Sequence, residues 1–279
     1  MTKIKPTIKC KCGEKNVKTF FTYNSPPKLE NINFSKKSIN YIRYYDKCDF
    51  CGHFFSRHSI DISDLYSAKY ISSTYGDENQ ILNKLQEINS LPSGSSDNEL
   101  RCKRINNFFT DKNCTTKKLL DVGSGIGVFP LRMLESKWNI TAIEMDDNLV
   151  SHLKKNLGIA SYNQDFLKLE ESNIGKFDLI TFNKVLEHIE SPDEYLSKAG
   201  QLIKEGGVIY IEVPDCLASI EGSEREEFLI EHHHIFSPIS LMILVQNSNL
   251  KLLSLSRIIE PSGKYTIFAF LGLNDKVTS

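Results

Sequence analysis

Three glycines at alternate positions constrain this chain more than any other feature of its sequence. They are Gly123, Gly125 and Gly127, and they lie in the segment Leu-Leu-Asp-Val-Gly-Ser-Gly-Ile-Gly-Val-Phe, residues 119–129. The pattern predicts a buried strand, a tight turn without Cβ atoms and the first turn of a helix. Such a turn brings backbone N–H groups and a helix N-terminus close to a ligand, because no side chains stand in the way.

An acid at the end of the next predicted strand adds a second element to this site. The segment 139–143 reads as a strand and runs directly into Glu144, whose carboxylate can accept hydrogen bonds from both hydroxyls of a ribose. A dinucleotide fingerprint would need its third glycine at the sixth position. Counted from Gly123, that position is Val128, so the sequence predicts a nucleoside site that fits NAD poorly.

Three more strands follow in the same order of strand, turn and helix. The first, short strand leads into Asp165 and Phe166, and the next covers residues 177–183. A glycine turn and an apolar run over residues 206–214 supply the third. Helical stretches separate these strands at the spacing of repeated βα units. The sequence therefore predicts an α/β fold around a largely parallel sheet.

The spacing Asp-x-Gly-x-Gly-x-Gly with an acid closing the next strand resembles the S-adenosylmethionine (SAM) site of class I methyltransferases. The segment Val-Leu-Glu-His-Ile, residues 185–189, also resembles a segment common in that family. The resemblance covers about residues 96–274 and implies a Rossmann-like, seven-stranded, mostly parallel sheet with helices on both faces. It implies SAM contacts from Asp121, Gly123, Ser124, Gly125, Gly127, Glu144, Met145, Asp165, Phe166 and Asn183.

Two close cysteine pairs near the N-terminus predict a structural zinc site. They are Cys10-x-Cys12 and Cys48-x-x-Cys51, each followed by glycine. Tetrahedral Zn²⁺ takes four such donors, and a short segment of this kind gains much of its stability from the metal. The first pair is one residue shorter than the usual knuckle, so His53 or His58 could replace one of its cysteines, and reduced free thiols are the alternative.

Charge sets this N-terminal segment apart from the rest. Residues 1–58 carry twelve Lys/Arg and four acids, whereas the whole chain has a net charge of −1. The excess predicts an anionic partner, or else a solvated surface that binds nothing in particular. We expect a zinc-binding module over residues 1–75, a helix and linker over 76–99, a SAM-binding domain over 100–274 and a tail over 275–279.

We call the expected zinc-binding module, residues 1–75, the front module. This module and the segment from Glu231 to Ser237 resemble those of bacterial C-methyltransferases that act on nucleotide-linked deoxysugars. In that group the histidine after the glutamate is the proposed base, which implies His232 here, with Glu231 to orient or charge it. Tyr66 and Tyr70 resemble a tyrosine-bearing segment there. The chain departs from the group at Leu229, where the group has tyrosine, and it ends soon after the last predicted strand, 267–270. We therefore expect a smaller substrate, or a front module that holds the diphosphate.

These features favour SAM-dependent methylation of a small molecule, such as a nucleotide-linked sugar or a polysaccharide precursor. One alternative is an RNA methyltransferase that uses the basic module, although the chain lacks an Asn-Pro-Pro-Tyr motif at Asn183. Another is a non-catalytic SAM-binding protein. No apolar run approaches the ~18 residues of a membrane span, and no signal-peptide core is visible, so we expect a cytoplasmic location.

Overall fold

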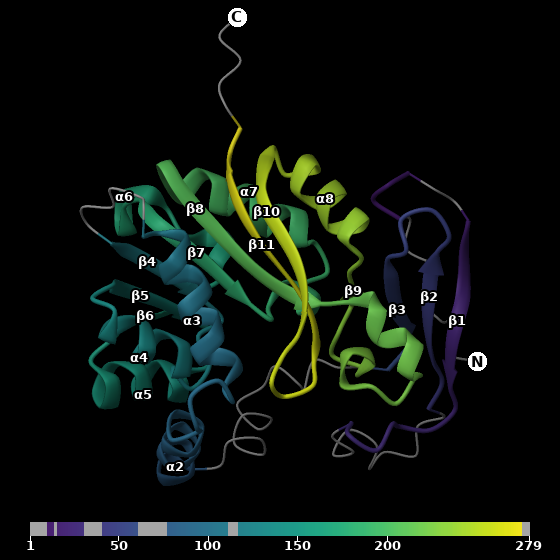
Figure 1. The fold of residues 1–279 in the computed structure, drawn as a ribbon, viewed down its shortest axis with the longest axis horizontal. Helices are drawn as coiled ribbons and strands as arrows, with labels where there is room; N and C mark the ends of the chain where they lie inside the picture. Colours follow the sequence, from purple (N-terminus) through teal and green to yellow (C-terminus); the bar gives the residue numbers. More distant parts are fainter. Residues whose placement is uncertain (1–9, 14–15, 31–40, 61–76, 111–116, 275–279) are drawn as a thin grey trace, which may run out of the picture.

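A seven-stranded sheet forms the body of the protein in a computed structural model, which describes residues 10–13, 16–30, 41–60, 77–110 and 117–274. The strand order is β10-β11-β8-β7-β4-β5-β6 (Figure 1). In chain order these strands are β4 (Lys118–Val122), β5 (Asn139–Glu144), β6 (Ala160–Asn163), β7 (Phe177–Asn183), β8 (Ile203–Pro214), β10 (Leu250–Ile259) and β11 (Tyr265–Leu273).

Five neighbouring strands, from β6 to β8, run parallel, and β11 is antiparallel to both β8 and β10. The predicted seven-stranded, mostly parallel sheet is therefore confirmed. The chain passes from β4 to β5 on one side and reaches β7 on the other. Ligands of open α/β sheets bind at such a reversal, outside the carboxyl ends of the strands. This geometry places the glycine turn after β4 at the expected position for a ligand.

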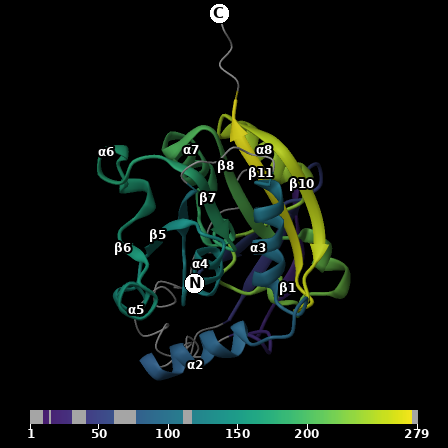
Figure 2. The same cartoon turned by 60° about the vertical axis from the view of Figure 1, so that its left-hand side comes forward.

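Helices cover both faces of this sheet, as predicted. One core contains side chains of α3 (Asp97–Phe108) and α4 (Val128–Glu135), and the other contains those of α7 (Pro192–Leu202) and α8 (Pro238–Asn247). Figure 2 shows α2 (Glu78–Asn89) beneath α4 and α5 (Asp147–Leu157), where Ile81 and Leu85 join a small core with residues of both. The other short helices in the described part of the chain are η3 (Phe166–Lys168), α6 (Glu171–Ile174), η4 (Leu186–His188), η5 (Cys216–Glu221) and η6 (Glu226–Phe228).

A second, four-stranded antiparallel sheet forms the front module. Its order is β1 (Val17–Tyr23), β2 (Arg43–Cys48), β3 (Phe54–His58) and β9 (His234–Ile235). The fourth strand comes from the later part of the chain and lies between the two sheets (Figure 1). The front sheet therefore includes two residues from far beyond the expected boundary at residue 75. Sequence periodicity could not reveal a strand of two residues.

Aromatic side chains fill the core that the front module shares with the larger domain. Phe54 is buried and packs edge-to-face against the ring of Phe228 at a centroid separation of 5.4 Å. Tyr45 packs against the same ring at 5.1 Å. In the part of the chain that the structure describes, no helix is long and apolar enough to cross a membrane.

Candidate active site

The glycine turn adopts a left-handed backbone conformation, which glycine permits because it has no Cβ. Gly125 and Gly127 have φ values of +54° and +84°. A Cβ at Gly127 would lie 2.7 Å from Leu153 Cδ2 and 2.5 Å from Leu157 Cδ1, so this glycine is needed for packing of α4 against α5. A Cβ at Gly125 would meet no atom within 4 Å. The backbone of Gly125 therefore faces open space that a ligand can occupy.

Glu144 lies at the end of β5 and reaches across to this turn. Its Oε2 accepts a hydrogen bond from the N–H of Gly125 at 2.8 Å, and its Oε1 accepts one from the N–H of Met145 at 2.8 Å. The Met145 side chain is 64% exposed. An acceptor pair beside an exposed apolar side chain suits a nucleoside, whose ribose hydroxyls donate and whose base is flat and apolar.

The third segment places its two predicted residues differently from each other. Asp165 caps η3, since its Oδ1 accepts a hydrogen bond from the N–H of Leu167 at 3.0 Å. The ring of Phe166 is buried against Phe182 and Tyr195, each with a centroid separation of 5.4 Å. Only the backbone of Phe166 is therefore available to a ligand, because its side chain belongs to the core.

Asp121, at the carboxyl end of β4, is the most buried acid of this turn. Its Oδ1 accepts hydrogen bonds from Thr181 Oγ1 at 2.6 Å and from Asn183 Nδ2 at 3.0 Å. Burial raises the pKa of Asp121 to about 6. The buried Oδ1 of Asn183 has no hydrogen-bond partner among the described residues. Because an unpartnered buried acceptor is costly, this oxygen and the nearby carboxylate suit an ammonium group, such as that of the SAM amino acid moiety.

Ser124 supports the same turn from within. It is 9% exposed, and its Oγ donates a hydrogen bond to the carbonyl of Asp121 at 3.1 Å. Gly123, with a φ of +71°, lies where a Cβ would come within 2.8 Å of Val185 Cγ2. The structure thus brings the predicted SAM residues together along the carboxyl ends of β4, β5, β6 and β7.

A second cluster lies beside this turn and contains the candidate base. Potential ligand atoms of Glu187, His188 and His232 lie within 4.8 Å of one another. Glu187 is 1% exposed, and its Oε2 has no hydrogen-bond partner in the described part of the chain. Burial raises the pKa of Glu187 to about 7 and lowers that of His188 to about 4. This group can share a proton, and its two imidazoles and carboxylate are also donors that suit a divalent metal.

The hydrogen bonds of His232 define its tautomer. Its Nδ1 lies 2.8 Å from the carbonyl of Glu227, which can only accept, so Nδ1 carries the proton and Nε2 keeps its lone pair. Burial holds the pKa of His232 well below its usual value, so the ring is neutral at pH 7. The Glu231 carboxylate was expected to orient His232, but the Glu227 carbonyl occupies the Nδ1 position instead.

The three consecutive histidines face different surroundings. The ring of His232 lies 4.8 Å from that of His188, whereas His234 Nδ1 lies 3.0 Å from His53 Nε2. His232 and His234 therefore contact different parts of the structure. Glu187 is not among the site residues predicted from the sequence, although its place in the Leu-Glu-His segment after β7 is a signal for the site. Tyr66 and Tyr70 lie outside the described residues.

The four cysteines of the front module converge on one point. Their Sγ atoms lie within 4.8 Å of one another, with separations of 3.4 Å for Cys10–Cys51 and 3.6 Å for Cys12–Cys48. Tetrahedral zinc with ~2.3 Å bonds to sulfur would place its ligands about 3.8 Å apart. The donor set therefore fits the predicted zinc ion. His53 lies against Ser240 and His234, and His58 Nδ1 lies 3.1 Å from the carbonyl of Ile60, so neither needs to replace a cysteine.

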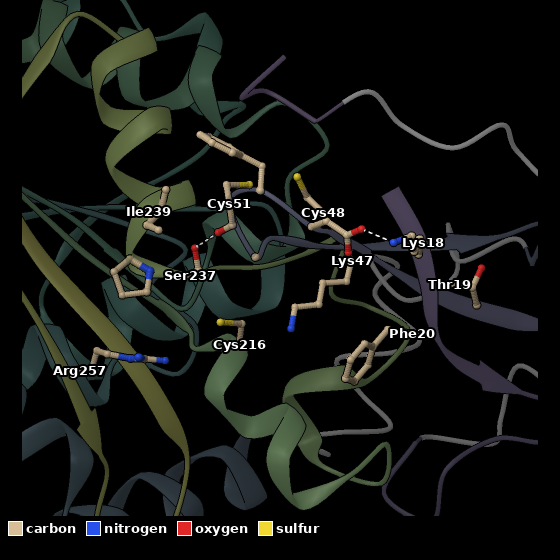
Figure 3. Close-up of a pocket in the computed structure, with 14 residues that line it drawn as sticks. Lys18, Thr19, Phe20, Lys47, Cys48, Cys51, Cys216, Ser237, Ile239 and Arg257 are labelled. Carbon is tan, nitrogen blue, oxygen red and sulfur yellow. Dashed lines mark hydrogen bonds and ion pairs between the residues drawn. The ribbon is translucent and has the colours of Figure 1, made fainter. Parts of the chain in front are cut away.

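A cavity of about 660 Å³ lies between the front module and the start of α8 (Figure 3). Lys18, Lys47 and Arg257 line it, and two of these cations have carboxylate partners. Lys18 pairs with Asp49 at 2.5 Å, and Arg257 pairs with Asp215 at 2.6 Å. The expected anionic partner of the basic module therefore remains a prediction, since little of the charge excess is concentrated here.

Known proteins with similar sequences are methyltransferases. The chain is 23% identical over 216 residues to a ubiquinone biosynthesis O-methyltransferase of Nitrosococcus oceani. This match covers 72% of this chain and 86% of that protein. It is 29% identical over 100 residues to the enzyme of the same name from Dechloromonas aromatica, where the match covers 34% of this chain and 43% of that protein. The match therefore spans most of one relative's length, 86%, but less than half of the other's, 43%.

Solved structures agree on the fold. An N-methyltransferase NodS from Bradyrhizobium japonicum, in complex with S-adenosylhomocysteine, has a TM-score of 0.54 at 13% identity and covers 76% of this chain and all of that one. The 1,6-didemethyltoxoflavin-N1-methyltransferase of Burkholderia thailandensis has a TM-score of 0.54 at 14% identity and covers 90% of this chain and all of that one. At such identities the likeness concerns the fold alone.

The family assignment rests on a match that spans more than half of the chain. A model described as a methyltransferase domain matches residues 96–255, which include the glycine turn, Glu144 and the segment around Glu187. The sheet order and the acids at the strand ends agree with it. The chain belongs to this methyltransferase domain family and is a SAM-dependent methyltransferase of class I.

Proposed function

We propose that this enzyme transfers the methyl group of SAM to a hydroxyl of a small-molecule acceptor, with His232 as the general base. The tautomer of His232 is the observation that supports its role as the base. Because the Glu227 carbonyl fixes the proton on Nδ1, Nε2 carries the lone pair. A ring nitrogen of His232 lies within 4.8 Å of a carboxylate oxygen of Glu187. A neutral imidazole in that state is the usual acceptor of a hydroxyl proton in enzymes.

The residues around the turn divide the work of holding the cofactor. SAM supplies a methyl group on a sulfonium, which makes the methyl carbon electrophilic. Glu144 offers acceptors to the ribose hydroxyls, and Asn183 and Asp121 offer acceptors to the ammonium group. We expect Met145 and Asp165 to contact the adenine, the latter through the carboxylate oxygen that does not cap η3. Much of the rate comes from positioning, because the acceptor oxygen must lie in line behind the methyl carbon.

The cluster beside the turn handles the proton. As the acceptor oxygen forms its bond to the methyl carbon and the carbon–sulfur bond breaks, the hydroxyl proton passes to Nε2 of His232. The resulting imidazolium lies within reach of Glu187, whose pKa burial raises to about 7 although the nearby Lys184 cation acts in the opposite direction. A positive ring stabilises the ionised form of that carboxyl group, so Glu187 and His232 support each other.

An oxygen acceptor is supported by the relatives that are named O-methyltransferases. A nucleotide-linked sugar or polysaccharide precursor also offers hydroxyls and stays within the proposal as its narrower form. Leu229 departs from the tyrosine of the sugar C-methyltransferase group, which speaks against attack by carbon. The four cysteines are proposed to bind one structural Zn²⁺, since four protein ligands leave no open position for chemistry.

The test uses His232→Asn, because an asparagine amide can still donate to the Glu227 carbonyl but has no atom equivalent to Nε2. We expect kcat to fall by about 10²–10⁴-fold while the Kd for SAM stays within twofold. Release of S-adenosylhomocysteine is measured with a panel of phenols, free sugars, nucleotide-linked sugars and RNA. Activity of His232→Asn within tenfold of wild type would remove the base, and turnover on RNA alone would contradict the small-molecule acceptor.

A further inference from the structure

The segment that carries His232 is held by the front module as well as by its own domain. We call residues 227–233 the base loop. Tyr45 in β2 is fully buried, and its hydroxyl lies 2.7 Å from the carbonyl of His232 and 2.9 Å from the carbonyl of Leu229. The phenol proton therefore bridges two carbonyls of the base loop, one of them in the candidate base itself.

A buried ion pair holds the preceding part of the loop. Arg43 is fully buried, and its Nη2 lies 3.0 Å from Glu30 Oε2. The same guanidinium donates from Nη1 to the carbonyl of Phe228 at 2.7 Å, and Glu30 Oε2 accepts from the N–H of Ile230 at 3.2 Å. Both charged side chains therefore form hydrogen bonds with the backbone of the base loop, and both are buried, so water does not screen them as it screens surface charges.

Backbone pairing fixes the far end of the loop. The N–H of Ser56, in β3, donates to the carbonyl of His233 at 3.0 Å, and β3 then pairs with β9. The second cysteine pair is joined to the same region, because Ser237 Oγ donates to the carbonyl of Cys51 (Figure 3). The front module thus contacts the loop at Phe228, Leu229, Ile230, His232 and His233.

The larger domain makes its own contacts with the loop. His188 Nδ1 donates to the carbonyl of Glu231 at 3.1 Å, and the N–H of His233 donates to the carbonyl of Glu187 at 2.7 Å. The base loop is therefore clamped between η4, which carries Glu187, and strand β2 of the other sheet. Loss of the front module would remove the donors of the Phe228 and His232 carbonyls, and loss of His188 would remove that of Glu231.

We infer that the front module is a positioning device for the general base, and that Tyr45 is the residue through which it acts on His232. This inference rests on the proposed role of His232. A methyl transfer needs the proton acceptor at hydrogen-bonding distance from the reacting hydroxyl, and a misplacement of about 1 Å can lower the rate about 10²-fold. Tyr45 acts as a positioning residue, since its hydroxyl contacts the main chain of His232 and leaves the ring free.

The experiment compares Tyr45→Phe with Tyr44→Phe in the full chain. Tyr44 immediately precedes Tyr45 in β2; its ring stacks with Arg57 at 4.3 Å, and no hydrogen bond of its hydroxyl is seen among the described residues. We expect Tyr45→Phe to lower kcat 10- to 100-fold with an unchanged Kd for SAM, and Tyr44→Phe to behave as wild type. The low-pH limb of the kcat profile should move to higher pH in Tyr45→Phe, because a looser His232 is better hydrated.

A loss of stability would also reduce activity at low pH, so the folded fraction is measured by circular dichroism at each pH. Only a limb that moves while the folded fraction is unchanged supports the inference. An unmoved limb and an unchanged kcat in Tyr45→Phe, together with a loss of activity in His232→Asn, would overturn the inference and leave the proposed function standing. Full activity of His232→Asn would overturn the proposed function itself. Should Tyr45→Phe fail to fold, Glu30→Gln provides the second variant, with a smaller shift of the limb expected in the same direction and an unmoved limb refuting the inference.

Discussion

The amide of Asn183 allows a sharp test of how the enzyme holds its cofactor. Nδ2 of Asn183 donates to Asp121, and Oδ1 is buried without a partner among the described residues. Asn183→Leu has similar volume and removes both functions. Thr181→Val removes only a hydrogen bond to the same carboxylate oxygen, at 2.6 Å. The two variants therefore differ chiefly in the loss of the free acceptor.

The magnitude follows from the strength of one charge-assisted hydrogen bond. Such bonds contribute about 1.5–3 kcal/mol, and each ~1.4 kcal/mol is a factor of ten in affinity. We expect Asn183→Leu to weaken SAM and S-adenosylhomocysteine about 10- to 100-fold. Thr181→Val should weaken them by less than about fivefold, while both variants lose a similar amount of thermal stability.

Titration calorimetry with three ligands decides the matter. Methylthioadenosine lacks the amino acid moiety, so its Kd should be the same in Asn183→Leu and wild type. An equal loss for all three ligands would show that the substitution distorts the turn. An unchanged affinity for SAM in Asn183→Leu would refute the assignment of Oδ1 to the ammonium group.

Burial raises the pKa of Asp121 to about 6, so most of its carboxylate forms in the folded chain only above that pH. The protonated carboxyl group therefore contributes stability below about pH 4, near its unfolded pKa, and this contribution is lost as the pH rises through 6. SAM affinity measured by calorimetry should therefore rise from pH 5 to pH 7, and a flat profile would contradict this role of the carboxylate. Cys48→Ser should release zinc and lower the melting temperature. If metal analysis of the wild-type protein finds less than half an equivalent of zinc, the four-cysteine site is contradicted. Gly125→Ala should lower the free energy of unfolding by about 1–2 kcal/mol, because of its positive φ alone. Gly127→Ala should lower it further in a denaturant titration, because its Cβ would also lie 2.7 Å from Leu153 Cδ2. Equal losses in the two variants would contradict this packing argument.

Local signals made the sheet and the cofactor turn predictable from the sequence. Strand β5 runs into Glu144 as expected, and the glycines bring their backbone to the same point. Each of these features depends on a few adjacent residues, which sequence patterns report well. Phe166 shows the limit of that approach, since the same pattern cannot tell a ring in the core from one that touches a ligand.

Tertiary contacts made the rest of the site unpredictable. The orienting partner of His232 is a backbone carbonyl, and every residue type carries one, so no motif can mark it. The contact between Tyr45 and His232 joins positions 187 residues apart in the chain. Glu187 was visible in the sequence, but its buried, unpartnered oxygen depends on how η4 meets the base loop.

The two-residue strand β9 has a consequence for synthesis on the ribosome. Strand β3 ends at His58, and its partner begins only at His234. At about 5–20 residues per second, the nascent front sheet waits roughly 9–35 s before its last strand emerges. Its open edge is exposed to neighbouring chains during this interval. Translation speed between these two points, and the chaperones present, should therefore influence the yield of folded enzyme.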